Sequence, residues 1–145
     1  MSENTKLVTP DWLFTVQDRL EDGQSVQIEY DREGDTLEII FAKGAGRGLE
    51  LSAEIILRYD VQTGLPLSLI LLSFSKLMQP TEFGPESFLL SGLKRLSAAE
   101  RERVMQILTS SPVNRYLRVS ALSLPPRIKQ LSPIVYLRQQ LAEVA

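Results

Sequence analysis

The chain has 145 residues, of which 43% are hydrophobic and 23% charged, and its net charge is −2. This is the composition of a globular protein that can bury a core without a disulfide or metal. It contains no cysteine and no histidine, which excludes disulfides, thiol nucleophiles and zinc–thiolate sites and removes the usual general base near neutral pH. No secretory signal pattern is visible, and the longest apolar run, Leu65–Leu72, is far shorter than a membrane span of about 20 residues. We therefore expect one domain over residues 1–145, in the cytoplasm and away from membranes.

The charge is unevenly distributed along the chain. Residues 1–86 carry 7 Lys/Arg and 15 Asp/Glu, a net charge of −8, whereas residues 87–145 carry 9 Lys/Arg and 3 Asp/Glu, a net charge of +6. Either the two halves face each other, within one chain or across a dimer, or the basic half meets a polyanion.

A helix is predicted over Pro10–Asp22. Thr9 can cap its N-terminus, Pro10 suits the first helical position, and Gly23 can end it. Four apolar residues recur at helical spacing: Trp12, Leu13, Val16 and Leu20.

A β-hairpin is predicted next. Val26–Tyr30 and Thr36–Ala42 alternate apolar and polar residues, and the segment DREGD between them has the composition of a turn. The hairpin carries five acids: Glu29, Asp31, Glu33, Asp35 and Glu38. We interpret the two strand glutamates as solvent-facing and the other three acids as turn residues. Their spacing does not fit a calcium loop, so we expect no metal site and no catalytic carboxylate pair here.

A second hairpin follows, with a strand at Glu54–Tyr59, a turn at Asp60–Gly64 and a strand at Leu65–Leu72. The last strand is apolar on both faces, which predicts that the sheet is covered on each side. The meander of four strands is expected to occupy residues 24–78.

The C-terminal part, residues 87–145, is predicted to be helical. Ser97 and Glu100 match a capping box, and an apolar stripe then continues to about Thr109. The segment 113–122 fits a helix or a strand, because Leu117, Val119 and Ala121 also alternate. A third segment after Pro133 has four apolar residues at helical spacing: Ile134, Leu137, Leu141 and Val144.

Both hairpins end their first strand with Tyr-Asp before a glycine-containing turn, and an Asp opens the second strand of the first hairpin. The positions that carry this pattern are Tyr30, Asp31, Asp35, Leu37, Ile39, Tyr59, Asp60 and Gly64. With them, residues 26–76 resemble the small β-rich family catalogued as domain of unknown function 2283. The resemblance implies a β-meander fold and no established activity. The chain departs from the family pattern at Glu38, where a tyrosine is common, and the usual glutamate of the last strand is missing.

Two further motifs favour ordinary structure over chemistry. The loop Lys43–Gly48 could cradle a phosphate, but it leads into β-like sequence instead of a helix N-terminus, so we interpret it as a flexible hairpin loop. Ser73–Lys76 fits the S-x-x-K of serine acyl-enzymes, but the companion S-D-N and K-T-G elements are absent, which indicates a chance match.

The basic C-terminal part has the outline of a helix-turn-helix, with a helix at 98–109, a turn at 110–111 and a second element at 112–122. On that second element, Asn114, Arg115 and Arg118 are of the types that contact base edges. Against this, the turn lacks glycine, and arginines on the first helix alternate with glutamates, as on a solvated surface.

The sequence thus predicts an α+β fold with an N-terminal helix, a four-stranded antiparallel β-meander, and C-terminal helices packed on the sheet. It predicts a non-catalytic interaction protein that associates with itself as a homodimer, with no cofactor and an unspecified protein partner. The alternative is a nucleic-acid-binding regulator that uses Asn114, Arg115 and Arg118.

Overall fold

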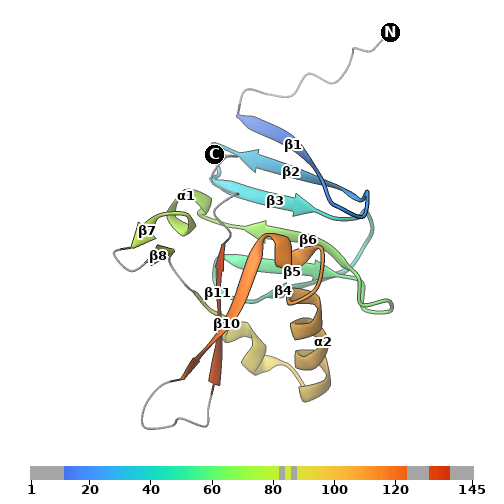
Figure 1. Ribbon diagram of the computed structural model, residues 1–145, viewed down its shortest axis with the longest axis vertical. Helices are drawn as coiled ribbons and strands as arrows, with labels where there is room; N and C mark the ends of the chain where they lie inside the picture. The colour runs from blue at the N-terminus through green and yellow to red at the C-terminus, as the bar shows by residue number, and fades with distance from the viewer. Residues whose placement is uncertain (1–11, 82–83, 86–87, 124–130, 138–145) are drawn as a thin grey trace.

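A six-stranded antiparallel sheet forms the centre of the molecule. The computed structural model describes residues 12–81, 84–85, 88–123 and 131–137. The strands lie in the order β1-β2-β3-β6-β5-β4 (Figure 1). Their bounds are β1 Leu13–Arg19, β2 Ser25–Asp31, β3 Thr36–Ile40, β4 Arg47–Glu50, β5 Ile55–Tyr59 and β6 Pro66–Leu71.

The predicted helix at Pro10–Asp22 is wrong where the structure describes it, because residues 13–19 form the edge strand β1; residues 10 and 11 lie outside the described residues. All seven residues of β1 pair antiparallel with β2, from Leu13 opposite Asp31 to Arg19 opposite Ser25. The backbone hydrogen bonds to β2 decide the conformation, since the apolar spacing fits both helix and strand.

Both predicted hairpins are confirmed, but they do not form a four-stranded meander. A meander would place β5 beside β3, whereas β3 pairs with β6, with Leu37 opposite Leu71. The chain crosses from β3 to the far edge of the sheet, forms the unpredicted strand β4, and returns through β5. The second hairpin therefore enters the sheet in the reverse order.

The predicted layer of C-terminal helices is also wrong, because the described part of this region contains much strand. The longest helix of the described residues, α2 Ala98–Leu108, begins as predicted, and the Ser97 hydroxyl accepts a hydrogen bond from the Glu100 amide at 3.2 Å. Within the segment 113–122, residues 113–115 form a 3₁₀ turn and residues 117–122 follow the strand alternative. Residues 131–137 form a strand where a helix was expected, and residues 138–145 lie outside the described residues. The remaining elements are α1 Phe74–Leu77, β7 Pro80–Thr81, β8 Gly84–Pro85, β9 Phe88–Leu89, the 3₁₀ segments η2 Ser91–Arg95 and η3 Val113–Arg115, β10 Leu117–Ser123 and β11 Leu131–Leu137.

The second layer consists of η2, α2, η3 and the β10–β11 hairpin. It lies on one face of the six-stranded sheet (Figure 1), and Val104, Leu108 and Leu117 of this layer belong to the core cluster. The strands β10, β11 and β9 form a separate three-stranded sheet. None of the described helices is long and apolar enough to cross a bilayer.

The core lies between these two layers. Alternate residues of the strands point into it, so that Ile39, Leu57 and Leu69 have no exposed surface, and Val104 and Leu108 of α2 meet them from the other side. The 3₁₀ segment η2 approaches the sheet very closely. The Gly92 amide donates to the Leu51 carbonyl at 2.9 Å, and a Cβ atom on Gly92 would lie 1.8 Å from the Glu50 carbonyl oxygen. A side chain at this position is therefore incompatible with the packing.

Candidate functional site

The two strand glutamates of the first hairpin are direct neighbours. Glu29 lies opposite Glu38 in the β2–β3 register, on the face of the sheet away from the core, and both are half-buried. Gln27 donates a hydrogen bond to Glu29 at 2.6 Å. Among the described residues, no group of three or more acidic side chains could hold a metal ion.

The turn acids of the same hairpin hold the local backbone. Asp31 accepts a hydrogen bond from the Gly34 amide at 2.9 Å, as predicted for a turn aspartate. Asp35, which has a φ of 51°, accepts from the Tyr30 hydroxyl at 2.7 Å and from the Ser75 hydroxyl and amide at 2.6 and 3.0 Å. Asp35 therefore joins the hairpin to α1.

Burial alone raises the pKa of Asp35, but the hydrogen bonds from Ser75 and Tyr30 stabilise the carboxylate and leave the pKa below its ordinary value. The aspartate is thus held ionised as a structural acceptor. Ser75, which lies inside the S-x-x-K segment, is one of its donors, and this favours a structural role for that segment.

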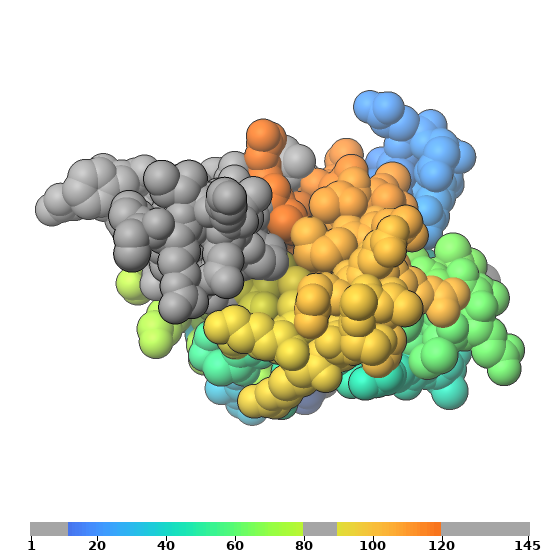
Figure 2. Space-filling model, turned by 90° about the horizontal axis from the view of Figure 1, so that it is seen from below, coloured from blue at the N-terminus to red at the C-terminus, as the bar shows by residue number. Residues whose placement is uncertain are grey.

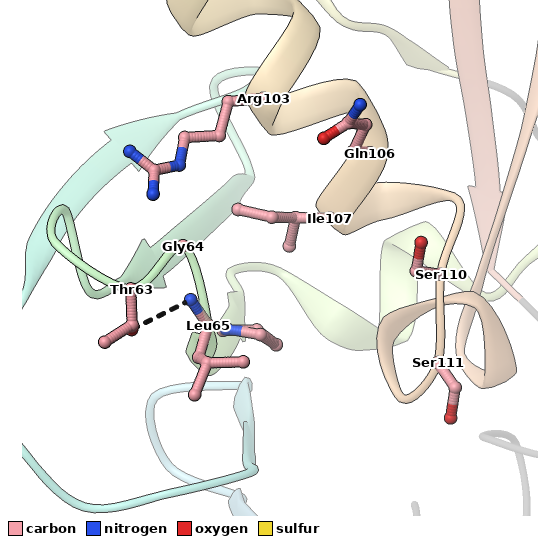
Figure 3. Close-up of a pocket in the computed structure, with 9 residues that line it drawn as sticks. Thr63, Gly64, Leu65, Arg103, Gln106, Ile107, Ser110 and Ser111 are labelled. Atoms are coloured by element: carbon pink, nitrogen blue, oxygen red, sulfur yellow. Dashed lines mark hydrogen bonds between the residues drawn. The ribbon is translucent and has the colours of Figure 1, made fainter.

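A surface pocket of about 310 Å³ lies between α2 and the β5–β6 turn (Figure 3). Arg103 extends from α2 over the turn and donates to the Val61 carbonyl at 2.8 Å and the Gln62 carbonyl at 3.3 Å. The turn itself is shaped by Gly64, whose φ is 76°. The lining residues are Thr63, Gly64, Leu65, Pro66, Arg103, Gln106, Ile107, Ser110 and Ser111.

Polar groups that line this pocket bond to the turn beside it. Its lining combines one cation with hydroxyl and amide groups and includes no carboxylate, so no hydroxyl in it has a lining acid as general base. The Thr63 hydroxyl accepts a hydrogen bond from the Leu65 amide at 3.2 Å. Thr63 and Arg103 thus both stabilise the turn.

The three residues predicted to contact nucleic acid do not lie on a recognition helix. Asn114 and Arg115 belong to the short segment η3, and Arg118 lies on β10. The Asn114 amide group donates to the Thr109 carbonyl at 3.3 Å, within the turn that follows α2. The helix-turn-helix outline is therefore replaced by a helix, a turn and a strand.

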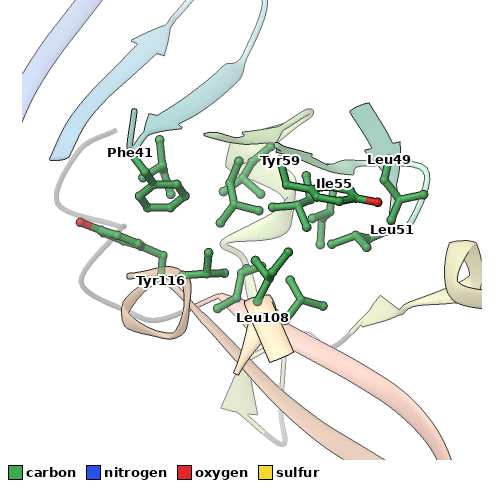
Figure 4. Packing of buried hydrophobic residues seen from close by; sticks show 14 of the residues in the cluster. Phe41, Leu49, Leu51, Ile55, Tyr59, Leu108 and Tyr116 are labelled. Carbon is green, nitrogen blue, oxygen red and sulfur yellow. The ribbon is translucent and has the colours of Figure 1, made fainter. Parts of the chain in front are cut away.

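Arg115 is joined to the edge strand of the large sheet. Its Nε and Nη2 atoms lie 3.0 and 3.4 Å from the carboxylate of Asp18 on β1, and the Tyr116 hydroxyl donates to the same carboxylate at 2.7 Å. The Tyr116 ring lies beside Phe41, with 6.1 Å between the ring centroids, and its hydroxyl points out of the apolar cluster (Figure 4). This cluster of Asp18, Arg115 and Tyr116 fixes the second layer to β1.

The hydrogen bond from Arg115 is the main reason that the pKa of Asp18 lies below its ordinary value; burial opposes the shift and Tyr116 adds to it. Burial, together with the bond to Asp18, raises the pKa of Tyr116 far above the ordinary value of 10.0. Both groups therefore keep one protonation state across the neutral range.

The edge strand β1 carries exposed apolar side chains that were not predicted from the sequence. Trp12, which directly precedes β1, is 40% exposed; Phe14 and Val16 lie on the core side of the sheet, yet they are 36% and 41% exposed. Their neighbours on β2, Ile28 and Tyr30, are buried. The alternation of apolar residues at 12, 14 and 16 was the available signal, and the helical interpretation of the same residues concealed it.

No protein-family model matches the chain, and neither does any curated protein or solved structure. The resemblance over residues 26–76 therefore stays a prediction, and no residue role is taken from it.

Proposed function

We propose that the protein is a non-catalytic interaction protein that associates with itself as a two-fold homodimer. One observation carries the proposal: the described residues include five exposed large hydrophobic side chains, and three of them lie within residues 12–16, at the start of the edge strand β1. Contiguous apolar surface of this kind is typical of protein interfaces. The three residues are Trp12, Phe14 and Val16.

The polar clusters support a binding role over a catalytic one, because each joins two parts of the fold. Asp18 connects β1 to η3 through Arg115, and Asp35 connects the first hairpin to α1 through Ser75. Arg103 connects α2 to the β5–β6 turn. Side chains that hold the structure in this way are poorly placed to take part in a reaction as well.

An ion pair joins the acidic half of the chain to the basic half. Asp18 in the acidic half pairs with Arg115 in the basic half at 3.0 Å, within one chain. Since Arg115 already neutralises this carboxylate, it contributes less to the field that a nucleic acid would meet. We therefore favour self-association over the nucleic-acid-binding alternative.

Light scattering after size exclusion, at low and high salt, tests the proposal. We expect a particle of twice the 16.3 kDa chain mass at high micromolar concentration under both conditions, because an apolar interface is little affected by screening. A monomer under both conditions would contradict self-association.

A further inference from the structure

The edge strand β1 offers an open hydrogen-bonding edge as well as apolar surface. In the β1–β2 pair, the Arg32 amide donates to the Trp12 carbonyl at 2.7 Å and the Leu20 amide donates to the Gln24 carbonyl at 2.8 Å. Even-numbered residues of β1 therefore bond to β2, because antiparallel partners alternate between bonded and non-bonded pairs. The amides and carbonyls of the odd-numbered residues point away from the sheet: Leu13, Thr15, Gln17 and Arg19.

The two edges of the sheet differ in how well they are protected. The opposite edge, β4, has only four residues, and Leu49 on its core side is buried. The chain just beyond it is covered by η2 through the Gly92–Leu51 hydrogen bond. By contrast, β1 is seven residues long, contains no lysine or proline, and pairs with β2 without a bulge; its one charge on the core side, Asp18, is bonded to Arg115 of the same chain. Natural edge strands normally carry such protective features.

The structure also places β1 at the margin of the molecule. In the space-filling view, the blue residues at the start of the described chain form one end, beside the orange segment that contains η3 (Figure 2). That segment contacts β1 at Asp18, while Trp12, Phe14 and Val16 remain exposed. The second layer thus stops short of these three residues.

We propose that β1 pairs antiparallel with β1 of a second copy, on a two-fold axis at Val16, so that the two six-stranded sheets join into one. This inference rests on the proposed self-association and specifies its surface. A two-fold axis at Val16 pairs the full length of the strand with itself. It bonds Leu13 to the second copy's Arg19, and Thr15 to the second copy's Gln17, through the outward backbone groups.

Charge complementarity on the outer face favours a second copy in this register. The second copy's Arg19 lies opposite Leu13, whose neighbour on β2 is Asp31. The pairing therefore brings a cation of one copy toward an anion of the other, and the two-fold axis repeats the contact. On the core side, the second copy's Asp18 lies opposite Phe14 and keeps its own bond to Arg115.

The same register places the two Val16 side chains against each other. Val16 occupies a non-hydrogen-bonded position across the new pair, where Cα atoms lie about 4.5 Å apart. This separation is within the range of a disulfide, and the chain contains no cysteine that could compete. A single introduced cysteine therefore reports the position of the axis.

The test is a cysteine scan of Phe14→Cys, Thr15→Cys, Val16→Cys and Gln17→Cys under mild oxidation, with Val61→Cys as the control. Val61 is a valine of similar exposure, 51% against 41%, on the turn after β5. We expect disulfide-linked dimer to form fastest at position 16, because only that residue meets its own copy. If the rate of disulfide cross-linking is highest at another position, or if cross-linking at position 16 is no faster than for Val61→Cys, the proposed pairing is overturned.

A second set of variants tests the edge without a disulfide. Thr15→Pro removes an outward amide and leaves the bonds to β2 intact; by symmetry it removes two intermolecular hydrogen bonds, so dimer affinity should fall by roughly tenfold or more. Val16→Lys places two like charges on the axis and should give a monomer, whereas Val61→Lys should not. Circular dichroism confirms that each variant is folded.

These experiments distinguish a failure of the β1 interface from a failure of self-association itself. A wild-type dimer that neither Thr15→Pro nor Val16→Lys weakens overturns the β1 interface but leaves self-association standing. A wild-type monomer overturns both, and this is also the result expected if the edge is covered by residues 1–11 or by a strand of another protein.

Discussion

The Tyr116 hydroxyl donates a hydrogen bond to the Asp18 carboxylate at 2.7 Å, across 98 positions of the sequence. Tyr116 is 1% exposed, and its ring packs into the core while its hydroxyl reaches the edge strand. Together with the Arg115–Asp18 ion pair, this bond joins the first strand of the sheet to the second layer.

We expect Asp18→Ala to lower the free energy of unfolding by about 1–3 kcal/mol, because it leaves the buried Tyr116 hydroxyl without this acceptor. Tyr116→Phe removes both the donor and the need for an acceptor, so it should cost only about 1 kcal/mol. Urea unfolding of both variants and of the double variant measures the coupling. Equal losses in the two single variants would contradict this account.

Acid should destabilise the protein partly through Asp35. Its folded-state pKa lies below the ordinary value of 3.8, so the unfolded chain takes up the proton first as the pH falls. The contribution of the ionised Asp35 to the free energy of unfolding is therefore complete above about pH 5. It is lost as the pH falls below about 4 toward the folded-state pKa. Asp35→Asn should cost stability near pH 6 and much less near pH 3, as measured by urea unfolding. Glu33→Gln, in the same turn, controls for the change in net charge.

Gly92→Ala should lower the free energy of unfolding by at least about 2 kcal/mol, because the added Cβ would overlap the Glu50 carbonyl and force backbone apart. Gly48→Ala is the matched control on the neighbouring strand, since a Cβ there meets no atom within 4 Å. Thermal and urea unfolding measure both variants. Equal stability of the two would show that η2 does not hold the sheet as closely as described.

Arg115→Ala should affect stability more than nucleic-acid binding. Its guanidinium bonds to Asp18, and we expect wild-type affinity for duplex DNA or single-stranded RNA no tighter than about 10⁻⁴ to 10⁻⁶ M at physiological salt. Fluorescence anisotropy with random-sequence oligonucleotides measures binding, and urea unfolding measures stability. Arg118→Ala is the comparison, since Arg118 is exposed on β10. Nanomolar binding that both variants abolish without unfolding would favour the nucleic-acid alternative.

Local patterns predicted the parts of the fold that depend on local contacts. The alternation in residues 26–40 and 55–71 gave both hairpins, and Ser97 with Glu100 gave the start of α2. The side-chain bond of Asp31 to the turn was predictable, because the Gly34 amide is only three residues away, although Asp31 itself is the last residue of β2.

The errors fall where distant partners decide the structure. Residues 13–19 satisfy a helical spacing and a strand alternation equally well, and pairing with β2 selects the strand. Residues 131–137 likewise pair with β10 and β9. The β3–β6 pairing also could not be predicted, because hairpin patterns do not say which strands of two hairpins become neighbours. For the candidate site, Arg115 was singled out from the sequence only as a nucleic-acid contact; its bond to Asp18 was not predicted, because Asp18 lies 97 positions away.

The order of the two layers along the chain has a consequence for biosynthesis. Every strand of the large sheet lies before residue 72, whereas the segments η2, α2 and η3 that cover its core face begin at residue 91. On the ribosome, the apolar face that includes Ile39, Leu57 and Leu69 is therefore complete before its cover has been made. Such nascent chains expose aggregation-prone surface. A chain stalled after the sheet should need a chaperone, and the full-length chain should lose that dependence once α2 has emerged.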